Sequence, residues 1–325
     1  MNGLSPLKDA YAREGYVVVR ELLDSRTVAL LAEKVIEQLR KHRITDGFTE
    51  IGQPRFKAPE QPDPDFLKFV DVMRSELTEA LFQAPKVIEV MKLLLDTDEV
   101  FVHPIKWVRG LAPLDSSMHS SPGVHQDFPE LQGSGQQITL WAPLFNVDER
   151  SGSLPVYTKK PGETLLPLEL ALNPSGWQVC PDVLGAKNVF ALGPGDVLLF
   201  NTFTPHGGAT NTGEGWRCSI EARFQPLAEP LALSNFAKPL LMQDWQTFYE
   251  GWRTWGFYWR DRHPPLIPFD PSWEHWRDLT AIGEAVKGNR NAVAALEIAA
   301  RFGMSEPIKS CAQGLLESFE CSYDQ

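Results

Sequence analysis

The chain has 325 residues, of which 43% are hydrophobic, enough for one large catalytic domain with appendages or for two ordinary domains. Its formal net charge is -11 and it has no run of lysines or arginines, which argues against a nucleic-acid partner. No stretch approaches the roughly 18 consecutive apolar residues of a membrane span, and the first residues are charged where a signal peptide is apolar. We therefore expect a cytoplasmic protein with no membrane partner.

The N-terminal region is predicted to form a helix, a strand and a second helix. Residues 7–14 fit the first helix, the apolar run 16–19 fits the strand, and an amphipathic helix runs from Asp24 to about His42. Asp24 is the predicted N-cap of that second helix. Residues 44–65 are rich in Pro, Gly, Asp and Gln and are expected to form a long loop, followed by an interrupted helical segment over about 64–95.

From Val100 the pattern changes to short β-branched or aromatic runs separated by Gly, Pro, Asn and Asp. The strands expected from these runs are residues 100–108, 136–145, 189–191, 197–200 and 218–224. This spacing is typical of an antiparallel β-sandwich or barrel. The fold class is therefore predicted to be mainly β with flanking helices.

The segment beyond Pro226 begins with an aromatic-rich stretch, DWQTFYEGWRTWGFYWRDRHPP. Its aromatic side chains could line an apolar substrate or, equally, form core or an oligomer interface. Helical patterns follow near residues 271–286, 289–302 and 305–319. Their apolar positions, which include Leu279, Val286 and Leu296, need burial, so these helices are expected to pack on the rest of the chain or on a second subunit.

Two histidines and an aspartate form the candidate metal site. His125 and Asp127 stand two residues apart in PGVHQDFPE, and residues so spaced in a strand share one face. The candidate third ligand is His206 in GPGDVLLFNTFTPHGG, beyond the end of another predicted strand. Two imidazoles and one carboxylate leave three metal positions open, as in non-haem Fe(II) oxygenases. We predict that Fe(II) is held by these three residues, which form the catalytic centre.

Arg217, in WRCSIEARF, is the candidate anchor for a co-substrate. An arginine inside an apolar barrel is costly unless it meets an anion, and its planar fork fits a carboxylate. The distal carboxylate of 2-oxoglutarate would supply that anion. Ser219 shares the strand face of Arg217 and is predicted to bond the same carboxylate. The alternative is a surface arginine in a strand.

Taken in order, these features resemble the phytanoyl-CoA dioxygenase-like family of Fe(II)- and 2-oxoglutarate-dependent oxygenases. The match runs through EGYVVVRELL, HQD, ITLWAPL, NVDERSGSL, GPGDVLLF, His206 and the RCS of Arg217, over roughly residues 5–226. The resemblance implies a double-stranded β-helix (a jelly-roll, cupin-like barrel) over residues 1–226. Residues 227–325 lie outside the resemblance and are expected to form an aromatic-rich and helical extension packed on that domain. The resemblance also implies 2-oxoglutarate and O2 as co-substrates. Gln126, Thr139 and Trp141 would help to hold the 2-oxoglutarate.

The region of the substrate pocket is less well defined. Where family members often have a PGSH turn after SGSL, this chain continues LPVYTKKPGE and lacks that histidine. His103 and Trp107 share strand parity in VFVHPIKWVRG, which makes both candidates for substrate contact. For His103 the alternative is a core histidine whose ring nitrogens are satisfied by neighbours.

The predicted function is oxidation of an unactivated C–H bond in a small, largely apolar molecule, by hydroxylation or by desaturation or ring closure, in specialised-metabolite biosynthesis. Two alternatives remain: a non-catalytic jelly-roll binding protein, and a cupin-like metalloenzyme that does not use 2-oxoglutarate. The expected partner is the small-molecule substrate, and a homo-oligomer through the C-terminal helices stays open.

Overall fold

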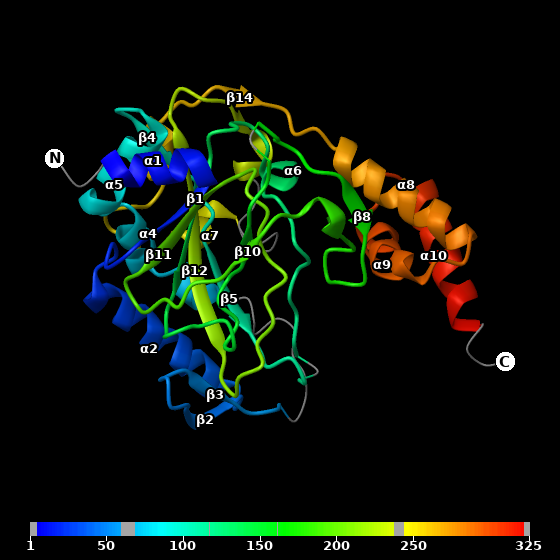
Figure 1. Cartoon of the computed structure of the whole chain (residues 1–325), viewed down its shortest axis with the longest axis horizontal. Helices are drawn as coiled ribbons and strands as arrows, with labels where there is room; N and C mark the ends of the chain where they lie inside the picture. The colour runs from blue at the N-terminus through cyan, green and yellow to red at the C-terminus, as the bar shows by residue number, and fades with distance from the viewer. Residues whose placement is uncertain (1–4, 60–68, 117, 161, 237–243, 322–325) are drawn as a thin grey trace.

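A six-stranded antiparallel sheet is the centre of the structure, a computed structural model that describes residues 5–59, 69–116, 118–160, 162–236 and 244–321 (Figure 1). The strand order is β1-β11-β6-β12-β4, and β5 pairs with β12 next to β4. The strands are β1 (Tyr16–Val19), β11 (Val197–Asn201), β6 (Ile138–Pro143), β12 (Arg217–Pro226), β4 (Val100–Val102) and β5 (Trp107–Leu111). Within the described ranges this sheet does not close into a barrel.

N-terminal helices cover one face of this sheet. They are α1 (Ser5–Glu14), α2 (Ser25–Lys41), α3 (Val70–Met73), α4 (Glu76–Phe82) and α5 (Pro85–Leu95). Their apolar sides share one buried cluster with Leu140, Leu199 and Ile220 of the sheet. The predicted helix, strand and helix are confirmed, and the Asp24 carboxylate accepts a 2.8 Å hydrogen bond from the backbone N–H of Thr27 as the N-cap of α2.

The opposite face of the sheet packs on a second layer of short strands. Trp141, Leu198 and Phe200 point to this side and contact Val147 and Val156. The second layer contains β7 (Val156–Tyr157), β8 (Leu168–Leu170), β9 (Trp177–Val179) and β10 (Lys187–Asn188), joined as the pairs β10-β7 and β8-β9. The space between the two layers is where the candidate metal ligands meet.

Two sequence predictions in this region were wrong. Residues 189–191 are not a strand. The strand in this region is β10, which ends one residue before that range and pairs with β7 through Asn188 opposite Val156. The predicted loop over 44–65 contains a hairpin of β2 (Thr45–Phe48) and β3 (Pro54–Phe56), and its residues 60–65 lie outside the described ranges. Gln53 fixes that hairpin by donating from Nε2 to the carbonyl of Asn146 at 3.0 Å.

The aromatic-rich segment is part of the core. It contains α7 (Trp245–Phe248) and the 3₁₀ turn η5 (Tyr258–Asp261), and it packs against the N-terminal helices. Trp252 Nε1 donates to the carbonyl of Arg74 at 2.7 Å, while the Glu76 carboxylate accepts bonds from the backbone N–H groups of residues 253–255. Of the two alternatives for these aromatic side chains, the core role is therefore the one observed.

The C-terminal helices form a separate unit with its own core. This helical unit consists of α8 (Ser272–Val286), the turn η6 (Arg290–Ala292), α9 (Val293–Phe302) and α10 (Glu306–Cys321), and it lies to one side of the sheet, next to β8 (Figure 1). Its core is built mostly of alanines around Leu296. Leu279 and Val286 are 58% and 72% exposed, contrary to expectation, because the alanine faces are the ones that meet.

The β8-β9 hairpin attaches the helical unit to the body. Leu170 belongs to the alanine core, and the Trp177 and Trp273 rings lie 5.5 Å apart. At the turn of the hairpin, a Cβ added to Gly176 would lie 2.7 Å from Ala295 Cα of α9. No helix in the described part of the chain is long and apolar enough to span a membrane.

Replacing Gly176 with alanine should destabilise the protein more than the same change at Gly288. Both glycines have positive φ, +74° and +80°, so the backbone strain of an added Cβ is shared. Only at Gly176 would that Cβ collide with another element, since Gly288 faces open space. Overpacking of this kind costs about 1–3 kcal/mol. Urea unfolding of both variants measures the difference, and equal losses would contradict the close packing of the hairpin on α9.

Candidate metal centre

His125 and His206 are brought together by a two-residue β-bridge between distant segments. The backbone N–H of each donates to the carbonyl of the other, at 2.8 and 2.9 Å. The spacing of His125 and Asp127 predicted that both lie in a strand, and for Asp127 this was wrong. Asp127 stands at the N-cap position of α6 (Phe128–Leu131), where Pro129 favours a helical start. The chain turns after the bridge, and the turn still directs the Asp127 carboxylate toward both imidazoles.

The three side chains present ligand atoms to one point. Asp127 Oδ1 lies 4.0 Å from His125 Nε2 and 3.7 Å from His206 Nε2. The three candidate ligand atoms all lie within 4.8 Å of one another, a set that one metal ion could bind. The structure therefore contains the predicted His125, Asp127 and His206 metal-binding triad.

Both imidazoles have the tautomer that a metal site needs. His125 Nδ1 lies 2.9 Å from the carbonyl of Gly123, and His206 Nδ1 lies 3.0 Å from that of Thr204. A carbonyl oxygen only accepts, so Nδ1 carries the hydrogen in each ring and Nε2 keeps a free lone pair. Burial also lowers the pKa of His206 to about 4, so this ring is neutral at physiological pH.

The Asp127 carboxylate is kept ionised by its neighbours. Burial alone would raise its pKa, but the Arg223 guanidinium and the two histidines outweigh that effect and hold the pKa far below its usual range. Thr139 Oγ1 donates to Asp127 Oδ2 at 2.6 Å. The structure thus places Thr139 against a metal ligand, whereas its predicted contact with 2-oxoglutarate stays a prediction.

Strand β12 carries a row of buried polar side chains on the face that meets the second layer. Arg217, Ser219, Glu221 and Arg223 alternate along it, and the residues between them belong to the apolar cluster under the N-terminal helices. The sequence analysis missed Glu221 and Arg223. The alternation that placed Ser219 beside Arg217 would have found both, had it been continued along EARF.

Arg217 is a buried cation without an anion. It is 7% exposed, Nη1 donates to Ser219 Oγ at 2.7 Å, and its guanidinium lies 5.8 Å from the centre of the Trp141 ring. Nε has no hydrogen-bond partner, and Arg217 forms no ion pair with any residue in the described ranges. Burial lowers the pKa of Arg217 to about 10, so it stays charged at neutral pH. Such a group favours an anionic ligand.

Gln126 and His103 have their polar atoms occupied by the protein. Gln126 Nε2 donates to the carbonyls of Thr164 and Phe203, and its Oε1 accepts from the Leu166 N–H. The ring nitrogens of His103 lie 3.1 and 2.9 Å from amide oxygens of Asn235 and Gln225. These contacts favour a structural role for Gln126 over one at 2-oxoglutarate, and the satisfied core histidine over substrate contact for His103.

Trp107 is half-buried on β5 and stands opposite Glu221 in the strand register. The Arg109 guanidinium lies 5.1 Å from the centre of its ring. Glu221 accepts from Arg109 Nε at 3.1 Å, so Trp107 borders the charged row of β12. Its contact with substrate stays a prediction.

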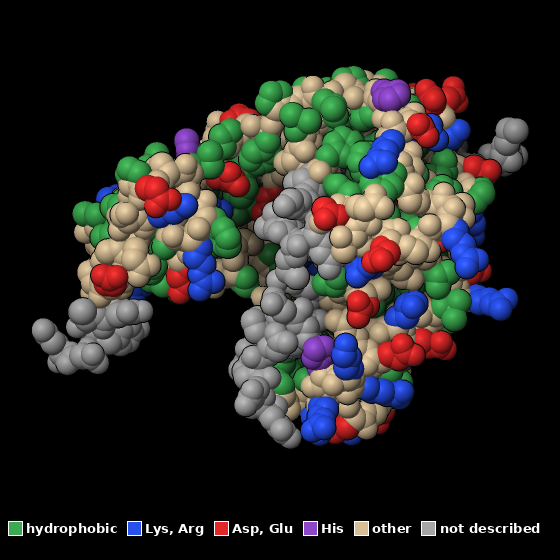
Figure 2. All heavy atoms as spheres, turned by 180° about the vertical axis from the view of Figure 1, so that it is seen from behind, with side chains coloured by type: hydrophobic (Ala, Val, Ile, Leu, Met, Phe, Trp, Pro, Cys, Tyr) green, Lys and Arg blue, Asp and Glu red, His purple; other side chains and the backbone are tan. Residues whose placement is uncertain are grey.

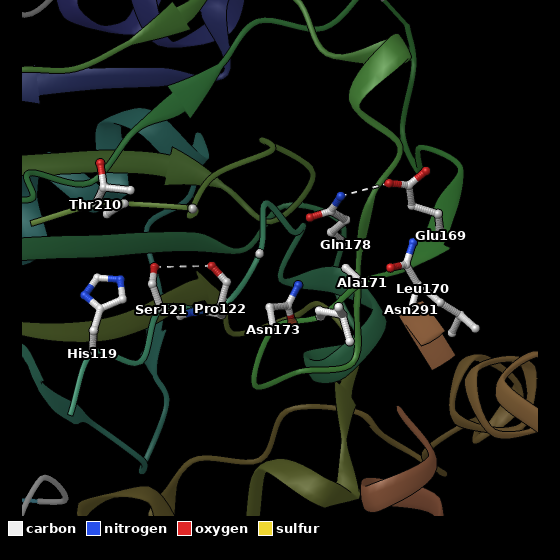
Figure 3. A pocket seen from close by; sticks show the side chains of 14 residues that line it. His119, Ser121, Pro122, Glu169, Leu170, Ala171, Asn173, Gln178, Thr210 and Asn291 are labelled. Atoms are coloured by element: carbon white, nitrogen blue, oxygen red, sulfur yellow. Dashed lines mark hydrogen bonds between the residues drawn. The ribbon is translucent and has the colours of Figure 1, made fainter. Parts of the chain in front are cut away.

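A pocket of about 410 Å³ lies between the body and the helical unit, and its lining includes residues close in sequence to the triad but none of the triad side chains (Figure 3). One wall is formed by segments that flank the metal ligands, with Ser121 before His125 and Thr210 after His206. Figure 3 shows Gln178 and Glu169 of the β8-β9 hairpin on the other side, where Gln178 Nε2 donates to Glu169 Oε1 at 2.8 Å. Asn291 of the helical unit completes the lining. From behind, a broad hollow separates the helical unit from the body (Figure 2).

No protein-family model matches the chain, and no curated protein matches its sequence. Its structure is similar to that of the epimerase SnoN in complex with Fe3+, alpha ketoglutarate and nogalamycin RO, with 20% identity, a TM-score of 0.50 and coverage of 71% of this chain and 86% of SnoN. It is also similar to apo ThoJ, a non-heme monooxygenase, with 13% identity, a TM-score of 0.50 and coverage of 90% and 99%. At these identities the likeness shows a shared fold of helices around an antiparallel sheet.

Asp127→Ala and His206→Ala should each abolish tight Fe(II) binding. Removing a residue that only hydrogen-bonds to a metal ligand lowers metal affinity about tenfold to a hundredfold. Removing a ligand itself should therefore lower Fe(II) affinity by more than about a hundredfold. Anaerobic Fe(II) titration of the purified apoprotein measures this. His119→Ala is the matched control, since His119 lines the pocket outside the triad and its Nδ1 bonds the Ala112 carbonyl. Parent-like iron affinity in either triad variant would refute the site.

Proposed function

We propose that this chain is an Fe(II)- and 2-oxoglutarate-dependent oxygenase with a jelly-roll core of the phytanoyl-CoA dioxygenase-like type. The observation that carries the proposal is Arg217, a buried cation that forms no ion pair with the described part of the chain, on the sheet face that also carries the partners of Asp127. A metal triad alone fits many chemistries. A triad together with a buried guanidinium on the same sheet face that has no ion-pair partner in the described ranges fits a dianionic co-substrate that binds the metal at one end and the arginine at the other.

The residues divide the work as follows. His125, Asp127 and His206 would hold the iron through two neutral imidazoles and one carboxylate. Arg217 and Ser219 would hold the distal carboxylate of 2-oxoglutarate. The two side chains already lie together, because Arg217 Nη1 donates a hydrogen bond to Ser219 Oγ. When bound, iron and 2-oxoglutarate supply the oxidation of a substrate C–H bond by O2, with release of succinate and CO2. Asp127 and His206 are 4% and 5% exposed, whereas the His125 side chain is 18% exposed, so of the three ligands His125 is the one most accessible to solvent.

We propose that the substrate is a small molecule that enters beside His125 through the pocket of Figure 3. Glu169, Gln178, Thr210 and Asn291 give that pocket hydrogen-bonding groups from three parts of the chain. This lining suits a molecule with hydroxyl or amide groups better than the largely apolar one expected from sequence. The helical unit supplies Asn291 and supports the hairpin, which is the role we propose for the extension over residues 227–325. A place in biosynthesis and a cytoplasmic location stay expectations.

Two alternatives make different demands on the same residues. A non-catalytic binding protein does not need imidazoles with fixed tautomers facing an ionised carboxylate. A cupin-like metalloenzyme that does not use 2-oxoglutarate does not need Arg217 buried and unpaired. Succinate formation dependent on both Fe(II) and 2-oxoglutarate supports the proposal, its absence from the iron-loaded parent with a range of small molecules supports the first alternative, and iron-dependent conversion without 2-oxoglutarate supports the second.

Arg217→Ala should raise the 2-oxoglutarate concentration needed for half-maximal binding about tenfold to a hundredfold and leave Fe(II) affinity unchanged. A charge-assisted hydrogen-bond pair is worth roughly 1.5–3 kcal/mol, which corresponds to that range. Arg217→Lys keeps the charge without the fork and should fall in between. The exposed Arg150, changed to Ala, controls for loss of one positive charge. An unchanged 2-oxoglutarate titration in Arg217→Ala would remove the basis of the proposal.

A further inference from the structure

The two carboxylate oxygens of Asp127 have different surroundings. Oδ1 faces the two imidazoles, 4.0 Å from His125 Nε2 and 3.7 Å from His206 Nε2. Oδ2 accepts a hydrogen bond from Thr139 Oγ1 at 2.6 Å and forms an ion pair with the Arg223 guanidinium, whose Nη2 lies 3.5 Å away. Only one of the two oxygens is therefore available as a metal ligand.

Arg223 is itself held in place by other charges. It is 6% exposed, and its Nη2 lies 3.2 Å from Glu221 Oε1, which also accepts from Arg109 Nε at 3.1 Å. Charges thus alternate from the half-exposed Arg109 through Glu221 and Arg223 to Asp127. Glu221 keeps Arg223 beside Asp127, while Thr139 reaches Oδ2 from the neighbouring strand, directly opposite Arg223 in the register.

We propose that Thr139 and Arg223 are positioning residues that restrict Asp127 to one-oxygen coordination of the metal. This inference rests on the proposed function, because bidentate 2-oxoglutarate and O2 together need three open metal positions. Carboxylates bind metals through one oxygen or two. If Oδ2 also coordinated, it would take one of those positions. Thr139 and Arg223 occupy Oδ2 from the side opposite the imidazoles and prevent this.

Removing Thr139 and Arg223 as partners of Oδ2 should not weaken metal binding. Arg223 is a cation next to a site for a dication, so its removal relieves a repulsion, and a freed Oδ2 can add a second metal bond. Loss of both donors should therefore leave Fe(II) affinity equal to or tighter than that of the parent. The 2-oxoglutarate affinity should fall, because its chelate would compete with Oδ2. A residue that merely supports the fold would weaken the binding of the metal first.

The test compares Thr139→Val, Arg223→Met and the double variant with the parent, all as full-length apoprotein handled without oxygen. The first readout is Fe(II) affinity. The second is the 2-oxoglutarate concentration that develops the visible charge-transfer absorption of the chelate on the Fe(II) protein. We expect Fe(II) affinity within about threefold of the parent or tighter, and a 2-oxoglutarate requirement raised about tenfold or more in the double variant, which corresponds to about 1.4 kcal/mol.

Thr202→Val is the matched control for Thr139→Val, since Thr202 is also 1% exposed but its hydroxyl has no hydrogen-bond partner. Thr139→Ser keeps the donor and should behave as the parent does. If Arg223→Met does not fold, the near-isosteric Thr139→Val carries the test alone, with the same shift expected in the same direction.

Three outcomes decide the matter. A weaker 2-oxoglutarate chelate with iron binding kept supports the inference. Weaker iron binding, or no change in either affinity, overturns it. A parent that binds iron but forms no chelate at any 2-oxoglutarate concentration refutes the proposed function itself, which is distinguishable because the parent, not the variants, then fails.

Discussion

The backbone bridge between His125 and His206 is the constraint on which the rest of the site depends. Two reciprocal hydrogen bonds join segments that are far apart in sequence and fix the relative position of both imidazoles before any ligand binds. Each ring is then oriented by a carbonyl two residues before it. Both rings are therefore already positioned when a metal binds, and most of the conformational entropy that is lost in ordering them is lost when the chain folds.

The sheet separates two environments that the site needs side by side. On β12, Cys218, Ile220 and Ala222 pack under the N-terminal helices, while the residues between them carry charge toward the second layer. Buried charges are tolerated when paired, and Glu221, Arg223 and Asp127 pair among themselves. Arg217 lies outside this set. Burial of its charge costs free energy that no ion pair within the described ranges offsets, and an anionic ligand would offset it.

Local pattern was sufficient for much of the fold and for the triad. The strand over the apolar run 16–19, the Asp24 cap and the strand over 218–224, which the structure extends to Arg217–Pro226, depend on neighbours in sequence, and all were predictable. The turn at Asp127 was not, because the same HxD spacing fits a strand as well as a bridge followed by a helical start. The triad was nevertheless predicted correctly, because a strand and a bridge followed by a helical start both direct the His125 and Asp127 side chains to one point.

Contacts between distant segments account for what sequence missed. Leu279 looks like a core residue by its helical periodicity, yet alanines such as Ala295 and Ala299 make the closer helix contact and leave it exposed. For His103, strand parity left both substrate contact and a core role open. The contacts of its ring with Gln225 and with Asn235, which comes from a segment beyond the sheet, favour the core role. Such partners are set by topology, which no local pattern contains.

The β8-β9 hairpin links the helical unit to the metal centre. The Trp177 ring lies 6.3 Å from that of His125 and 5.5 Å from that of Trp273 on α8, so one indole lies between a metal ligand and the unit. The Val179 N–H donates to the carbonyl of Val124, next to His125, at 2.7 Å. Because the same hairpin carries Glu169 and Gln178 into the pocket, any change in how the unit packs would act on pocket shape and on His125 together. Of the other two ligands, His206 is held by its bridge to His125, while Asp127 stands at the start of α6. The C-cap residue of α6, Gln132, exchanges two hydrogen bonds with Asp270 just before α8, so the helical unit is connected to the Asp127 side of the site as well.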